Sequence, residues 1–131
     1  MSVSRVDVTE TAVRLIERLK TIYGDLMFHQ SGGCCDGSSP MCYPRKEFKI
    51  GERDVFLGVV ADCPVYISGM QFEYWKGAHL TIDAVKGRGS GFSVEAPEGV
   101  RFIIRSRIYS DEEWAVLEAQ GEPPRGEQLV G

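Results

Sequence analysis

The sequence predicts one α+β domain that is mainly β, with a small curled sheet or barrel, one long N-terminal helix and a short C-terminal helix. Two observations predict this class. Residues 9–23 carry the periodicity of an amphipathic helix, whereas the segments between residues 25 and 109 are short, closely spaced and strand-like. Because one long helix cannot bury all of these strands, we expect the sheet to curl on itself.

The predicted N-terminal helix runs from Thr9 to Tyr23. Charged residues occupy one side of a 3.6-residue period, and the opposite side is apolar: Ala12, Leu15, Ile16, Leu19 and Ile22. Thr9 or Thr11 can cap its start, and Gly24 can end it in a left-handed conformation.

The strand-like segments follow in order along the chain. They lie at residues 25–30, 47–51, 54–60, within 63–75, and at 79–85, 92–97 and 100–109. Ser68 and Gly69 are expected to form a turn inside the fourth segment. The fifth alternates apolar Leu80, Ile82 and Ala84 with polar residues, which is typical of a strand with one buried face.

The C-terminal region predicts a short helix and then a tail. Ser110 is followed three residues later by Glu113, the pattern of a capping box, which predicts a helix to about Ala119. Residues 121–131 have no apolar period and are expected to be mobile. With 131 residues, near the usual size of one domain, we expect residues 1–120 to form a single domain.

Charge and composition exclude several partners. Lys and Arg total 15 against 19 acidic residues, so no basic surface for DNA or RNA is expected. Residues 1–19 mix charges through every turn and contain no apolar segment for export or membrane insertion. We therefore expect a cytoplasmic protein without a membrane partner. In that reducing compartment, clustered cysteines more often bind metal or do redox chemistry than form disulfides.

The strongest candidate site is the segment from residue 28 to residue 44. It contains Cys34, Cys35, Cys42 and His29, and residues 36–41 are rich in amino acids that turn tightly. Such a loop lets the thiolates converge on one ion, although the spacing differs from the paired cysteines of zinc ribbons. A reactive thiol and a purely structural turn are the alternatives.

Cys63 and the histidines have plainer alternatives. Cys63 lies at a strand start, where a lone cysteine is often a small buried hydrophobic residue. His29 is a suitable ligand for zinc, iron or copper, or else a histidine held by a hydrogen bond at a strand end. His79 is interpreted as a surface turn residue.

Aromatic residues at positions 72–75 predict self-association. On a strand, Phe72 and Tyr74 would lie on one face and Trp75 on the other, so they could not all enter one core. We therefore expect a homo-oligomer, most simply a two-fold dimer.

Two stretches, "FHQSGGCCDGSSPMC" and "CPVYISGMQFEYWKGAHLTIDAVKGRGSGFSVE", and the helix before them resemble a bacterial family catalogued as a domain of unknown function. The resemblance covers about residues 5–110. Members of that family are often encoded beside aldehyde or alcohol dehydrogenases. The resemblance therefore implies such a dehydrogenase as partner.

A more distant similarity is to the A-type iron-sulfur carriers of the HesB-like fold. "SGGCCDG" stands where those proteins carry a comparable loop, so Cys34 would match their first cluster ligand. Their two C-terminal cysteines have no counterpart in residues 100–114. The resemblance therefore implies a HesB-like domain with a different ligand set, drawn from Cys35, Cys42, Cys63 and His29.

Together these observations favour a small metal- or iron-sulfur-binding accessory protein that serves an aldehyde or alcohol dehydrogenase system. The cofactor would be zinc, iron or an iron-sulfur cluster held by Cys34, Cys35, Cys42, Cys63 and His29. One alternative is a redox or nucleophilic thiol at Cys34 or Cys35, activated by His29 or by backbone N–H groups. Another is a non-catalytic interaction domain with structural cysteines. We favour a role without catalysis.

Overall fold

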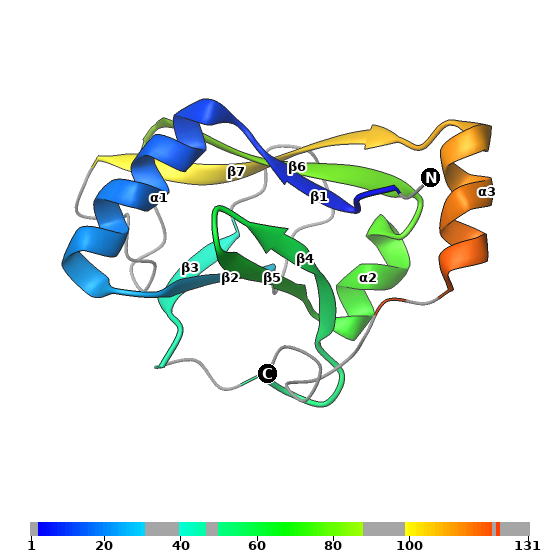
Figure 1. The fold of residues 1–131 in the computed structure, drawn as a ribbon, viewed down its shortest axis with the longest axis horizontal. Coiled ribbons are helices and arrows are strands. Elements are labelled where there is room, and N and C mark those ends of the chain that lie inside the picture. The colour runs from blue at the N-terminus through cyan, green and yellow to red at the C-terminus, as the bar shows by residue number, and fades with distance from the viewer. Residues whose placement is uncertain (1–2, 31–39, 47–49, 88–98, 122, 124–131) are drawn as a thin grey trace.

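The computed structural model describes residues 3–30, 40–46, 50–87, 99–121 and 123. These residues form an α+β fold that is mainly β (Figure 1). In chain order the elements are β1 (Val6–Val8), α1 (Glu10–Tyr23), β2 (Leu26–Gln30), β3 (Met41–Pro44), β4 (Val55–Val60), β5 (Cys63–Ile67), α2 (Gly69–Trp75), β6 (Ala78–Lys86), β7 (Val100–Ile108) and α3 (Asp111–Gln120).

The strands form two mixed sheets. One has the order β1-β6-β7, with β1 parallel and β7 antiparallel to β6. The other has the order β3-β2-β5-β4, in which β2 and β5 are parallel and the outer pairs are antiparallel. Figure 1 shows one sheet above the other, with α1 at one end and α2 and α3 at the opposite end. The prediction of one curled sheet is therefore corrected to two, because no ladder joins the sheets within the described ranges.

The core lies between the sheets. Phe28 of β2 meets Phe102 of β7 edge to face, with ring centroids 4.8 Å apart. Helix α1 closes one end with Ala12, Ile16 and Leu19, all fully buried, whereas Ile22 is 58% exposed. The predicted apolar face of this helix thus reaches the core over its first three turns only.

The predicted helix ends are confirmed. The Thr9 hydroxyl accepts a hydrogen bond from the Ala12 N–H at 3.2 Å and caps α1, and Gly24 ends the helix with φ at 80°. Ser110 and Glu113 form the predicted capping box of α3. These ends were predictable because caps depend on residues only a few positions apart.

The segment after β5 is helical, which corrects the predicted turn and strand. Ser68 does not sit in a turn but caps α2, accepting a hydrogen bond from the Gln71 N–H at 3.3 Å. On this helix Phe72 and Trp75 lie three positions apart and both enter the core, while Tyr74 is 71% exposed. The assignment of Phe72 and Trp75 to opposite faces of a strand is therefore wrong, because both enter the core from one helix. The expectation that the three aromatic residues do not all enter one core is confirmed by the exposed Tyr74.

Strands β1 and β3 were not predicted, because segments of three and four residues carry too little period to be recognised. Residues 50 and 51, at the end of a predicted strand, are not in a strand.

Several other predictions fall on residues 31–39, 47–49, 88–98, 122 and 124–131, which lie outside the described part of the chain. They include the strand at 92–97 and most of the tail.

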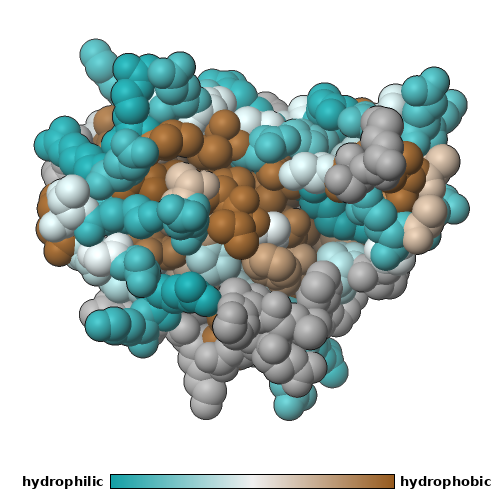
Figure 2. Space-filling model, viewed as in Figure 1, coloured by the Kyte–Doolittle hydropathy of each residue, from teal (hydrophilic) through white to brown (hydrophobic). Residues whose placement is uncertain are grey.

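On the face drawn in Figure 2, polar side chains surround a central apolar area. Brown side chains gather there over the region between α1 and the β4–β5 hairpin. Partly buried hydrophobic residues from these elements pack against the core: Leu15, Leu57 and Ala61. Within the described ranges, no helix combines the length and apolarity that a membrane span requires.

Candidate functional site

The imidazole of His29 is fixed by a carboxylate. His29 Nε2 lies 2.9 Å from Asp54 Oδ1, and their side chains are 6% and 16% exposed. Asp54 lies directly before β4, and His29 lies in β2. Because β5 lies between β2 and β4, the His29–Asp54 contact links two strands that are not neighbours in the sheet. The carboxylate is itself anchored, because its Oδ2 accepts a hydrogen bond from the Gly51 N–H at 2.8 Å.

This pair has a defined chemistry. Because an ionised carboxylate can only accept, Nε2 carries the proton, and the lone pair of the neutral ring is on Nδ1. A carboxylate that orients a histidine in this way is common behind metal ligands and behind general bases. His29 was predicted either as a metal ligand or as a histidine held by a hydrogen bond at a strand end, and the hydrogen bond is present. Asp54 was missed, because no sequence signal links residues 25 positions apart.

Cys42 and Cys63 lie in the apolar core and are fully buried. Cys42 pairs with Phe28 on one side of β2, while Cys63 is in β5 on the other side. Cys42 in β3 and Cys63 in β5 are two strand spacings apart, and Cys63 is offset by two residues from Val65, the partner of Phe28 in β5. Their Cα atoms are therefore roughly 11 Å apart. This is too far for both thiolates to lie about 2.3 Å from one zinc ion. The structure does not bring these two cysteines together.

Burial also disfavours the thiolate form of Cys63. Desolvation raises the pKa of its thiol to about 11, and the nearby Lys20 ammonium lowers it only in part. His29 follows Phe28 in β2, so its side chain is on the face opposite the core and away from both cysteines. Among the residues that the structure describes, no three His, Cys, Asp or Glu side chains form a metal-binding group. Cys34 and Cys35 lie outside those residues.

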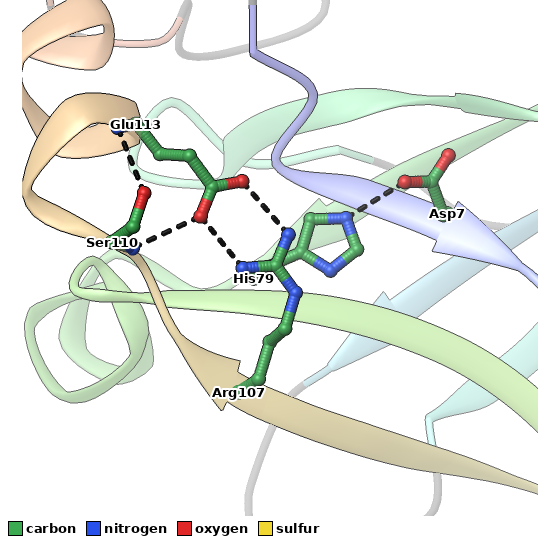
Figure 3. A network of polar contacts seen from close by, with 5 residues as sticks. All are labelled: Asp7, His79, Arg107, Ser110 and Glu113. Carbon is green, nitrogen blue, oxygen red and sulfur yellow. Dashed lines mark hydrogen bonds and ion pairs between the residues drawn. The ribbon is translucent and has the colours of Figure 1, made fainter.

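A second polar cluster surrounds His79 (Figure 3). His79 is only 8% exposed, in β6, so its interpretation as a surface turn residue is wrong. Its Nε2 lies 2.7 Å from Asp7 Oδ2, which ties β1 to β6, and its ring meets Tyr109 at 6.2 Å between centroids. No local signal marks this contact, because Asp7 is 72 positions away in sequence.

Arg107 stands opposite His79 on β7 and joins the same cluster to α3. Its guanidinium donates two hydrogen bonds to the Glu113 carboxylate, at 2.7 and 2.8 Å, and the Ser110 N–H donates a third at 2.9 Å. These bonds from Arg107 and Ser110 lower the pKa of Glu113 to about 2. The cluster therefore attaches α3 to the sheet through charge.

Acid should weaken this attachment. The folded pKa of Glu113 is about 2, below its ordinary value of 4.5, so its stabilising effect is present above pH 4.5 and is lost as pH falls toward 2. Urea unfolding of the wild type and the Glu113→Gln variant should differ most near neutral pH and converge on acidification. A difference that does not change with pH would contradict this assignment.

The sequence comparison assigns a family. A sequence profile described as Domain of unknown function (DUF779) matches residues 15–108. The chain belongs to the DUF779 family. No curated protein matches it. The DUF779 region contains the His29–Asp54 pair and all four cysteines, whereas Asp7 and Glu113 of the second cluster lie outside it. The His29–Asp54 pair is therefore the stronger candidate for a site that belongs to the DUF779 domain.

Proposed function

We propose that this DUF779 protein is a small metal- or iron-sulfur-binding accessory protein that uses His29, Cys34 and Cys35 as ligands for zinc, iron or an iron-sulfur cluster. The supporting observation is the His29–Asp54 contact of 2.9 Å. It holds an imidazole near the end of β2, and the chain continues from there as Ser-Gly-Gly-Cys-Cys.

The chemistry of these residues suits a borderline-soft metal. Thiolates and imidazole together are the preferred ligands of zinc, and thiolates are those of iron-sulfur clusters. A carboxylate behind the histidine raises its basicity and fixes its orientation. Cys42 and Cys63 are left out of the proposed set, because both are buried in apolar surroundings, where a thiolate would be poorly solvated.

The same pair also favours one alternative. An imidazole oriented by a carboxylate can take the proton from a neighbouring thiol, so Cys34 or Cys35 would act as a redox or nucleophilic thiolate. Metal content separates the two functions. A protein without metal whose thiol titrates below its ordinary pKa supports the alternative.

The partner and the assembly are part of the proposal. The dehydrogenase system is inferred from the family resemblance, and the HesB-like fold from the glycine-glycine-cysteine loop. A cytoplasmic homodimer is inferred from composition and from exposed apolar residues. Met70 and Tyr74 lie one turn apart on α2 and are 78% and 71% exposed, which suits a contact with a partner or with a second copy.

Elemental analysis and visible absorption of protein purified without oxygen test the metal function. We expect zinc or iron in the parent, its loss in the Cys34→Ser/Cys35→Ser double variant, and its retention in Cys63→Ala, a matched control that removes a buried thiol. Asp54→Asn should weaken metal affinity by about 10- to 100-fold, because the histidine loses its orienting carboxylate.

Two outcomes would contradict the proposal. A parent protein that carries no metal and shows no visible absorption would remove the function itself. Metal retained in the Cys34→Ser/Cys35→Ser variant and lost in Cys63→Ala would instead show that the ligand assignment is wrong.

A further inference from the structure

A cavity lies between the start of β1, α2 and α3. Figure 1 shows α2 and α3 at the opposite end of the molecule from α1. The volume of the cavity is about 320 Å³, within the range of small-molecule sites. Six side chains form most of its wall: Arg5, Phe72, Lys76, Trp114, Leu117 and Glu118. Of these, only Phe72 and Lys76 lie in the part of the chain that the DUF779 profile matches.

Arg5 is the central charged group of this cavity. Its guanidinium carbon lies 5.6 Å from the centroid of the Phe72 ring, a cation–π contact that holds the side chain in place. Its carbonyl oxygen accepts a hydrogen bond from the Leu80 N–H at 3.1 Å, which anchors the backbone beside β6. Arg5 also lines an adjoining cavity of about 240 Å³, so it stands where the two meet.

The charge of Arg5 is not neutralised by a carboxylate in the described residues. The other cation of the wall, Lys76, has such a partner, because its ammonium lies 3.0 Å from Glu73. Glu118 is the one acidic residue in the described wall. A partly buried guanidinium with several donors is therefore directed at a cavity, and a planar anion is the ligand that it matches best.

The rest of the wall is apolar. Phe72 and Leu117 are 3% and 1% exposed and form a rigid base, while Trp114 is 37% exposed and presents an accessible ring. An aromatic ring can stack on indole, and the carboxylate of the same molecule can pair with Arg5. We propose that this cavity binds a small aromatic carboxylate, with its carboxylate on Arg5 and its ring against Trp114.

Phenylacetate is a suitable probe, with tryptophan fluorescence as the readout. Trp114 is the more exposed of the two tryptophans, because Trp75 is only 5% exposed. We expect saturable binding of phenylacetate. Benzyl alcohol, which lacks the charge, and acetate, which lacks the ring, should each bind at least about tenfold more weakly.

Three variants assign the binding to this cavity. Arg5→Gln should weaken phenylacetate binding by about tenfold or more, and Arg14→Gln, the same change on the exposed face of α1, should leave it unaltered. Glu118→Gln should strengthen it, since an acidic neighbour is removed. This last variant keeps the test valid if Arg5→Gln does not fold.

The inference is overturned if the wild type shows no saturable binding, if benzyl alcohol binds as well as phenylacetate, or if Arg5→Gln and Arg14→Gln behave alike.

Discussion

Replacing Phe28 with alanine should destabilise the protein by about 3–5 kcal/mol, the largest loss that we expect from a single substitution. Phe28 is fully buried, and its contact with Phe102 joins the two sheets across the core. Removing the ring leaves a cavity between the two sheets. The sheets cannot fill this cavity unless one of them moves as a whole. The expected loss is a large share of the stability of a small domain.

The free energy of unfolding, measured with urea and followed by circular dichroism, checks this result. Phe56→Ala is the matched control, because it also removes a phenylalanine ring. Phe56 lies on the face of β4 that points away from the core, and it is only partly buried. We expect the control to lose less than half as much. Equal losses would show that the two sheets do not depend on the Phe28–Phe102 contact.

Replacing Gly24 with alanine should destabilise the protein by about 1–3 kcal/mol, through the backbone alone. Gly24 ends α1 with φ at 80° and ψ at −151°, a region that residues with a side chain rarely adopt. A Cβ atom there would meet no other atom within 4 Å, so no steric clash contributes. The cost is therefore conformational strain at the helix end.

Gly77→Ala is the control for this effect. A Cβ atom at Gly77 also meets nothing within 4 Å, but its φ is outside the left-handed range. Thermal unfolding of the two variants should show a lower midpoint for Gly24→Ala and little change for Gly77→Ala. If both variants unfold at the same temperature, the positive φ at Gly24 has no measurable cost.

Elements with local signals were predictable from the sequence. Helix α1 follows the period of Ala12, Ile16 and Leu19 and is capped by Thr9, and α3 follows its capping box. The nine-residue strand β6 was long enough for its alternation to be recognised. Helix α2 was not predicted, because its seven residues after the Ser68 cap contain only one pair of buried residues at helical spacing.

The candidate site was predictable only in part. His29 was named from its proximity in sequence to the cysteines, but Asp54 was not, because their contact depends on the order β3-β2-β5-β4. Cys42 was grouped with the ligands because it shares a turn-rich loop with Cys34 and Cys35, and Cys63 was added from a strand start. The same strand order separates Cys42 and Cys63 on either side of β2. His79 was predicted as a surface turn residue, although it lies buried in β6. Its partner Asp7 comes from β1, a strand far away in sequence, so no local pattern marks the contact.

The sequence by itself determined the α+β class, the ends of α1 and α3, and a pattern specific enough to identify the family over residues 15–108. These features depend on periodicity and on capping residues within a few positions of one another. The tertiary structure alone decided that Asp54 fixes His29, that two cysteines belong to the core, and that Arg5 faces a cavity beside Trp114. Each of these depends on strand order and helix packing, which bring together residues that are far apart in sequence.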